Sequence, residues 1–333
     1  MIRPATVADM WALRRKPSRR IYFYNDALLA STYHPYIQTL RGLLDPIGAR
    51  SDHLTLVLRD HGLRGFLQAH RRSTETEVDL QFLTAYGHRH QLRMGDGDVF
   101  FQLLEALIQR VANHQVQRVF AAVGHRSTDV IEVLRQLGFQ PYTQQSIWML
   151  AEPVVEVGSS MVALRRQTRQ DAWALHQLYL SLTPRVVQQA ELRESSSWEY
   201  SPRRRWIQLR ERRWVLGDDK ELTVHLQLCT GPRGHVLRPM IAPHLGADAA
   251  AMVRYMLTQI HEQRPVFAII RAYESHLRGT LEELGFVERG EQTLFVKQLA
   301  LMQRQSLFAP TLRPIEQGEG AMAMAVDQRT DAH

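Results

Sequence analysis

Two stretches, LRQLGFQPY at 134–142 and LEELGFVER at 281–289, repeat the same order of residue types. Each begins Leu-polar-polar and continues with Leu-Gly-Phe. Glycine readily adopts the left-handed conformation that ends many helices, and an apolar residue after it returns the chain to a core. The sequence therefore predicts two helices that end at Gly138 and Gly285, each followed by a strand.

A second repeated pattern indicates that the chain is duplicated. Arg-x-x-Thr-x-x-Asp occurs at 3–9 and again at 165–171, an offset of 162 (165 − 3), whereas the Leu-Gly-Phe stretches are offset by 147 (285 − 138). The first copy is thus longer by 15 (162 − 147) in its interior, where loops tolerate insertions. Each threonine is predicted to cap a helix, with the aspartate in its first turn. We expect domains at 1–150 and 161–300, a linker at 151–160 and a largely disordered tail at 301–333.

Composition limits the class of protein. The 333 residues carry a net charge of +7 and are 44% hydrophobic, which suffices for two cores. No apolar run approaches the ~20 residues that span a bilayer, and the N-terminus lacks a secretory pattern, so we expect a cytoplasmic protein. The single cysteine, Cys229, lies in a predicted strand and is interpreted as a buried structural thiol. It excludes an internal disulfide and a cysteine-based zinc site, and we expect no metal.

Basic runs at 14–20 and 203–214 raise the question of a polyanionic partner. We interpret them as solvated helix faces whose tryptophan and leucine positions contact the core, and we do not expect nucleic acid to bind.

Apolar periodicity predicts the same order of elements in both copies. In the first copy, strands are expected at 2–4, 53–60, 63–71, 77–86, 118–124 and 146–153, and helices at 7–13, 99–114 and 127–139, with helical and irregular segments at 21–43. In the second copy, strands are expected at 162–165, 212–216, 221–229, 234–242, 265–272 and 292–300, and helices at 169–180, 185–200, 248–262 and 275–284.

This order, with the repeated Arg-x-x-Thr-x-x-Asp start and Leu-Gly-Phe helix end, resembles the GNAT acyltransferase superfamily. The resemblance covers roughly residues 1–300, and it implies an α/β (α+β) fold of two tandem GNAT-like domains, each a mixed, mostly antiparallel sheet flanked by helices. It also implies acetyl-CoA as co-substrate, with the pantetheine arm bound to backbone of the fourth strand. These backbone positions are Leu83 and Ala85 in the first copy and Ile241 in the second.

The resemblance further implies a loop whose amides bind the pyrophosphate, at the start of the next helix. In the first copy, Gly95 and Gly97 match its glycine positions, while its Gln/Arg position falls on Leu92, beside Arg93. A tight turn capped by Asp98 is the alternative for this stretch. In the second copy, the loop is represented by Gly246 and Ala247.

The acid that many relatives use, a tyrosine four residues before the helix-end glycine, is replaced by Leu134 and Leu281. Tyr273 could donate a proton and Glu274 could accept one, but an edge aromatic and a helix-start carboxylate are the favoured interpretations of these two residues. Glu77 and Asp79 could act as a base or face solvent.

Two functions remain open from the sequence. One is an acyl-CoA-dependent N-acyltransferase acting on a small-molecule or peptide amine. The other is a non-catalytic module that binds acyl-CoA or a small ligand. The oligomeric state is not predicted, apart from packing of the two copies as an intramolecular pseudo-dimer.

Overall fold

The strands form a single mixed sheet. The computed structural model describes residues 1–14, 17, 19–23, 26–44, 53–60, 63–72, 76–86, 96–153, 163–199, 210–218 and 220–299. Within them, only the pairs β5–β6 and β11–β12 are parallel. The spatial order is β1 (Ile2–Pro4), β3 (His53–Arg59), β4 (Leu63–Arg71), β5 (Glu77–Ala85), β6 (Arg118–Gly124), β13 (Val287–Gln298), β7 (Gln140–Leu150), β12 (Val266–Arg271), β11 (Gly234–Ile241), β10 (Leu222–Gly231), β9 (Arg210–Gly217) and β8 (Arg165–Arg166), while β2 (Arg19–Tyr22) pairs with β5.

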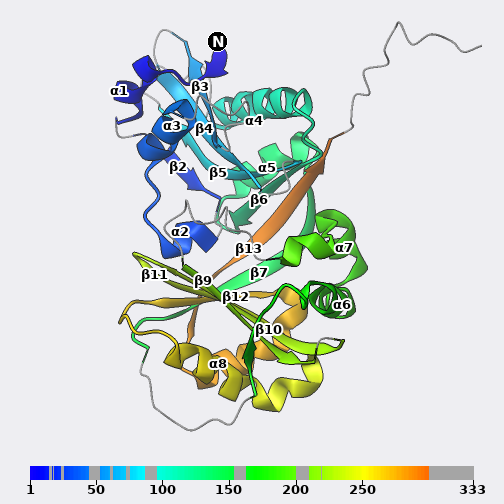
Figure 1. Ribbon diagram of the computed structural model, residues 1–333. Helices are drawn as coiled ribbons and strands as arrows, with labels where there is room; N and C mark the ends of the chain where they lie inside the picture. Colours follow the sequence, from blue (N-terminus) through cyan, green and yellow to red (C-terminus); the bar gives the residue numbers. More distant parts are fainter. Residues whose placement is uncertain are drawn as a thin grey trace, which may run out of the picture. The chain divides into compact units, whose positions relative to one another are not determined.

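Helices lie on both faces of this sheet (Figure 1). Because side chains alternate along a strand, Leu56 and Leu58 of β3 pack in one cluster with α4 and α5, whereas Val57 packs on the other face with α1. The helices are α1 (Met10–Leu13), α2 (Asp26–Ala30), α3 (Pro35–Leu44), α4 (Asp96–Ala112), α5 (Thr128–Gln136), α6 (Ala172–Leu182), α7 (Arg185–Glu191), α8 (Ala249–Thr258) and α9 (Arg278–Glu283), with 3₁₀ helices at Val7–Asp9, Ser195–Trp198, Pro243–Asp248 and Ala272–Leu277.

The repeated Arg-x-x-Thr-x-x-Asp pattern forms the same hydrogen-bonded unit twice. Asp9 is fully buried and accepts hydrogen bonds from Arg3 and from the backbone and hydroxyl of Thr6. Asp171 is held in the same way by the second copy of the pattern. The predicted cap is confirmed for Thr6, which is the N-cap of the 3₁₀ helix Val7–Asp9 and forms a capping box with Asp9. It is wrong for the second copy, where Asp171 and not Thr168 occupies the N-cap position of α6. Burial raises the pKa of both aspartates, but the arginine and threonine hydrogen bonds outweigh it and lower each pKa.

The two Leu-Gly-Phe stretches end helices as predicted. Gly138 and Gly285 have φ angles of 78° and 81°, in the left-handed region. Phe139 N donates to Leu134 O at 2.9 Å, and Phe286 N donates to Leu281 O at the same distance. Together with the bond from each glycine N–H to the carbonyl three residues earlier, this is the Schellman arrangement, which satisfies the last helical carbonyls.

We call residues 1–150 the first half of the chain and residues 161–300 the second half. The last strand of each half pairs with a strand of the other half. β13, from the second half, pairs with β6 of the first, and β7, from the first half, pairs with β12 of the second (Figure 1). β7 and β13 pair with each other at the centre, where Gln145 Nε2 donates to Gln292 Oε1 at 2.7 Å. These two residues are related by the repeat offset of 147 (292 − 145), so the pairing is symmetric about them. Each half therefore completes the sheet of the other.

The predicted elements are largely confirmed, and the fold class is confirmed. The main error is in the segment 21–43, expected to be helical and irregular, which begins with β2 before α2 and α3. The final strand of the first copy begins at Gln140, six residues before the predicted 146 (146 − 140). The linker predicted at 151–160 and the tail at 301–333 lie largely or wholly outside the described residues, and the domain bounds stay predictions. Among the described helices, none combines the length and apolar character needed to cross a membrane.

Candidate functional site

The sheet separates at two equivalent places. β5 and β6 pair in parallel over three positions, from Glu77–Arg118 to Asp79–Phe120. β11 and β12 pair over three positions as well, from His235–Val266 to Leu237–Ala268. Beyond these positions β5 is no longer paired with β6, and β11 is no longer paired with β12. One edge of β5 pairs with β4 and one edge of β11 pairs with β10, so the opposite edge of each strand borders the place where the sheet separates. We call the two places the first-half gap and the second-half gap.

The edge of β5 at the first-half gap is paired with β2. The register sets Ile21 opposite Leu83 and Arg19 opposite Ala85, and Phe23 N donates to Gln81 O at 3.1 Å. Because hydrogen-bonded positions alternate in an antiparallel pair, Leu83 and Ala85 are the positions whose backbone groups face β2. The chain itself thus fills this gap.

The edge of β11 at the second-half gap has fewer partners. Ala242 N donates to Thr223 O at 3.0 Å on the β10 side, so alternation turns the backbone groups of Pro239 and Ile241 toward the gap. The Ile241 carbonyl lies 3.1 Å from His276 Nε2. Among the described residues, no strand pairs with β11 at Pro239 or Ile241 on this side.

Two glutamates lie near the end of β12, at the border of the second-half gap. Glu274 is 8% exposed, and its Oε2 accepts a hydrogen bond from Arg271 N at 2.8 Å. Burial raises the pKa of Glu274 to about 7, because the Arg271 N–H only partly offsets the loss of solvent. Burial also raises the pKa of Tyr273, to about 12. The predicted pair is therefore a protonated tyrosine next to a carboxyl group that titrates near neutral pH.

The second glutamate, Glu191 of α7, has the opposite shift. It is 4% exposed, accepts hydrogen bonds from Arg193 Nε at 2.8 Å and Arg271 Nη2 at 3.1 Å, and is also bonded by Tyr179. Burial raises its pKa, but the two arginines outweigh burial and lower the pKa to about 2. Glu191 is thus a permanently ionised group that fixes Arg271 at the end of β12.

The arrangement of strands is similar to that of solved structures. A tandem GNAT protein from the clavulanic acid biosynthesis pathway, solved without AcCoA, is 14% identical, with 90% of this chain and 98% of that chain covered and a TM-score of 0.53. The chain has a tandem GNAT fold. A GCN5-related N-acetyltransferase from Sphaerobacter thermophilus is 13% identical, with 90% of this chain and 95% of that chain covered and a TM-score of 0.49. N-myristoyltransferase from Saccharomyces cerevisiae, with bound myristoyl-CoA, is 10% identical, with 89% of this chain and 78% of that chain covered and a TM-score of 0.47.

Comparisons of sequence alone find no such likeness. No family model matches the chain, and no curated protein matches it.

The loop residues predicted from the GNAT resemblance divide into three groups. Arg93 and Gly95 lie outside the described residues. Gly97 is the second residue of α4, where a Cβ atom would meet no atom within 4 Å. Because α4 begins at Asp96, Asp98 lies inside its first turn and not at the predicted capping position. Gly246 and Ala247 lie in the 3₁₀ turn that leads into α8, next to the second-half gap.

The remaining acidic candidates are paired with arginines. Glu77 accepts hydrogen bonds from Arg118, and Asp79 accepts two from Arg72, at 2.9 and 2.7 Å. Arg72 also lies 3.3 Å from Glu77. These contacts indicate a structural ion-pair network, and no described group of three or more His, Cys, Asp or Glu residues could hold a metal ion.

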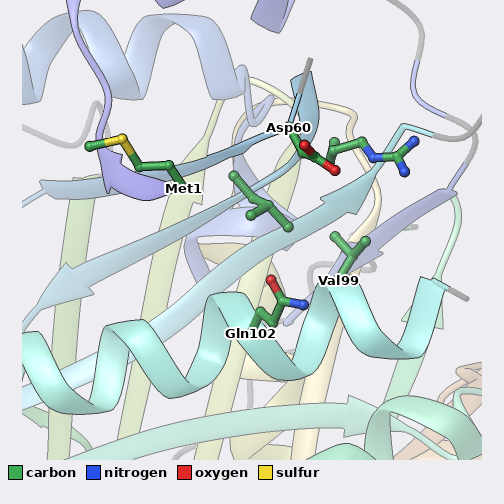
Figure 2. Close-up of a pocket in the computed structure, with 6 residues that line it drawn as sticks. Met1, Asp60, Val99 and Gln102 are labelled. Carbon is green, nitrogen blue, oxygen red and sulfur yellow. The ribbon is translucent and has the colours of Figure 1, made fainter. Parts of the chain in front are cut away.

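Two pockets lie on first-half elements, away from the second-half gap. One, of about 210 Å³, is formed over β3, β4 and α4 by Met1, Leu58, Asp60, Arg64, Val99 and Gln102 (Figure 2). The other, of about 230 Å³, has mainly aromatic walls: Leu13, Arg14, Pro17, Arg20, Tyr22, Tyr33, His34, Pro35, Tyr36, Phe66, Phe82 and Tyr86. The rings of this second pocket also pack with one another, so they serve the core of that face.

Sequence reasoning missed three features of the site: β2, His276 and Glu191. A run of β-branched and aromatic residues after Pro17 could have indicated β2. His276 corresponds by the offset of 147 to Asp129 of the first half (276 − 129), so an alignment of the two copies could have singled it out. Nothing in the local pattern distinguishes Glu191 from an exposed helical glutamate.

Proposed function

We propose that the protein is an acyl-CoA-dependent N-acyltransferase that transfers an acyl group, acetyl in the simplest case, to an amine of a small molecule or peptide. The observation that carries this proposal is the second-half gap, where two parallel strands separate and leave the backbone edge at Pro239 and Ile241 without a strand partner among the described residues. The GNAT fold of solved structures supports it at the level of fold.

The residues at this gap suit an acyl-CoA. The Ile241 N–H and the Pro239 carbonyl can each bond one amide group of an extended pantetheine arm, as an added strand would. Pro239 has no N–H, so it supplies only an acceptor. Gly246 and Ala247 lie at the N-terminal end of α8, where unpaired amides and the helix dipole favour a pyrophosphate. Asp248 occupies the N-cap position of α8 without a side-chain hydrogen bond to the helix, so its carboxylate does not occupy those amides.

Two side chains suit the proton transfers of acyl transfer. Acyl-CoA supplies the acyl group as a thioester, which an amine attacks directly with release of the CoA thiol. Glu274, with a pKa of about 7, can accept a proton from an ammonium group near neutral pH. Tyr273, with a pKa of about 12, holds its proton at that pH and can donate it to the leaving sulfur. Arg271, held by Glu191, places positive charge beside both groups.

The alternative is a non-catalytic module that binds acyl-CoA. The specific observation in its favour is that Leu134 and Leu281, which replace the family's tyrosine, are buried core residues at 0% and 1% exposure. Binding without turnover would support this alternative.

The first experiment is calorimetric titration of the full-length protein with acetyl-CoA and CoA, followed by thiol-release assays with a panel of amines. Binding with turnover that Glu274→Gln lowers at least tenfold would support the transferase. A conservative control is Glu283→Gln, an exposed position on α9 whose carboxylate forms an ion pair with the exposed Arg254. Absence of binding up to millimolar ligand would refute both functions.

A further inference from the structure

We infer that each chain binds one acyl-CoA, in the second-half gap only, because β2 permanently occupies the place of the ligand in the first-half gap. This inference rests on the proposed function. It assigns β2 as a built-in substitute for the pantetheine arm, supplied by the chain itself.

The backbone of β2 satisfies the edge that a ligand would need. β2 pairs with β5 from Arg19–Ala85 to Tyr22–Phe82, and Phe23 N extends the pairing to Gln81 O. The hydroxyl of Thr84 also donates to Arg19 O at 2.8 Å. An acyl-CoA could reach this edge only by displacing these hydrogen bonds, whereas at Ile241 it would displace no described strand.

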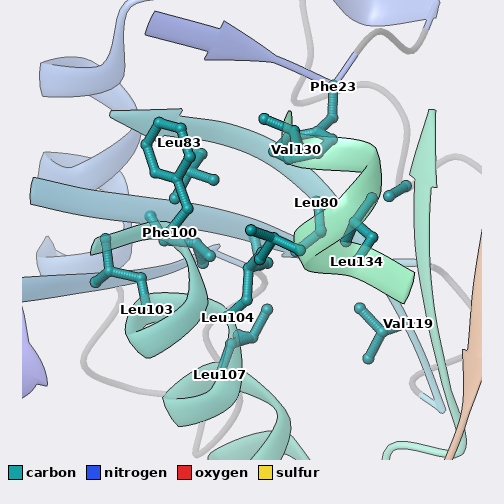
Figure 3. Close-up of a cluster of buried hydrophobic side chains, with 14 of the residues drawn as sticks. Phe23, Leu80, Leu83, Phe100, Leu103, Leu104, Leu107, Val119, Val130 and Leu134 are labelled. Carbon is teal, nitrogen blue, oxygen red and sulfur yellow. The ribbon is translucent and has the colours of Figure 1, made fainter. Parts of the chain in front are cut away.

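Side chains anchor β2 from both sides of the segment. Phe23 is 1% exposed, belongs to one core cluster with residues of β5, α4 and α5, and lies beside Val130 (Figure 3). Ile21 belongs to the same cluster. At the start of β2, Arg19 Nη2 donates to Asp129 Oδ1 at 2.6 Å, which ties the strand to the first turn of α5. The segment is therefore part of the core of the first half and not a loosely held strap.

Among the residues of the second half that the structure describes, no strand lies at the corresponding place. At the offset of 162 that relates the two starts, residues 19–23 correspond to 181–185, where α6 ends and α7 begins. Pro17 explains the difference, because proline cannot continue a helix and the residues after it favour a strand. His276, the counterpart of Asp129, contacts the Ile241 carbonyl directly instead of anchoring an inserted strand.

The test is calorimetry of the full-length protein with CoA, with two variants that each add one negative charge. Gly246→Asp places the charge at the start of α8, and Gly124→Asp places it at the end of β6, which borders the first-half gap. Neither glycine has a positive φ, and a Cβ atom at either would meet no atom within 4 Å, so both variants are expected to fold. We expect a stoichiometry of one, at least tenfold weaker binding for Gly246→Asp, and unchanged binding for Gly124→Asp.

Two kinds of failure are distinguishable in this test. A stoichiometry of two would overturn the single-site inference and leave the proposed function standing. The same conclusion would follow if Gly124→Asp weakened binding and Gly246→Asp left it unchanged. No binding by the wild-type protein would overturn the proposed function and this inference with it. As an independent readout, the amides of 21–23 should show the same hydrogen-exchange protection with and without CoA. Loss of that protection on adding CoA would show that the ligand displaces β2.

Discussion

The variant Glu274→Gln is expected to gain stability relative to the wild type as pH rises from about 4.5 to about 7. Glu274 is 8% exposed, and burial raises its pKa from 4.5 to about 7. Between these pH values the folded state holds a proton that the unfolded state has lost, so the free energy of unfolding falls as pH rises. The difference between the two pKa values corresponds to roughly 3 kcal/mol. Glutamine cannot ionise, and it therefore removes this decline.

The assay is urea unfolding of wild type and variant at several pH values between 5 and 8. Glu191→Gln is the matched control with the opposite sign. The pKa of Glu191 is lowered to about 2, so its carboxylate stabilises the fold above pH 4.5 and this contribution is lost only as pH falls toward 2. Its replacement should destabilise the protein throughout the range. If Glu274→Gln and wild type show parallel pH dependence, Glu274 is not held protonated, and its proposed role as a proton acceptor near neutral pH loses its physical basis.

Three further outcomes follow from packing and backbone geometry. Phe23→Ala should lower the free energy of unfolding by about 3–5 kcal/mol in urea titrations, because the ring is 1% exposed in the core; a loss below about 1 kcal/mol would contradict the anchoring of β2. Gly138→Ala should cost roughly 1–2 kcal/mol because of its φ of 78°, whereas Gly97→Ala, in a helix with open space, should be neutral or stabilising by up to about 1 kcal/mol; thermal melts that rank the two in the reverse order would refute this. Gln145→Leu alone should cost about 1–3 kcal/mol by leaving Gln292 buried without its partner, and a double replacement by leucine should recover most of it in a double-mutant cycle; additive costs would show that the two amides are not coupled.

The parts of the fold that the sequence predicts are held by short-range bonds. The Leu-Gly-Phe helix ends depend on bonds that span five residues, such as Phe139 N to Leu134 O, and the required glycine is visible in the sequence. The Arg-x-x-Thr-x-x-Asp unit is closed by bonds within seven consecutive residues, from Arg3 to Asp9. Repetition of these local units predicted the duplication, and together with the order of the predicted strands and helices it led to the fold class.

Long-range pairing could not be predicted in the same way. The exchange of β7 and β13 leaves the alternation of apolar residues in each strand unchanged, because a strand buries the same face beside either neighbour. β2 was missed because its four paired residues were included in a segment interpreted as helical and irregular, although the β-branched and aromatic residues after Pro17 favour a strand. For the candidate site, the glycines near α4 and α8 could be located by motif, but the glutamate Glu191 becomes part of the site only when α7 packs beside β12.

The strand exchange explains how one half could lose its ligand gap without loss of the protein. The first half supplies β7 to the second, and its α2 packs against the second half, where Ala30 shares a cluster with Cys229 and Val236 and its carbonyl accepts a hydrogen bond from Arg233 N at 2.9 Å. These contacts involve β7 and α2, which lie outside the edge of β5 that β2 covers. The presence of β2 on the edge of β5 is therefore compatible with these contacts of β7 and α2 with the second half.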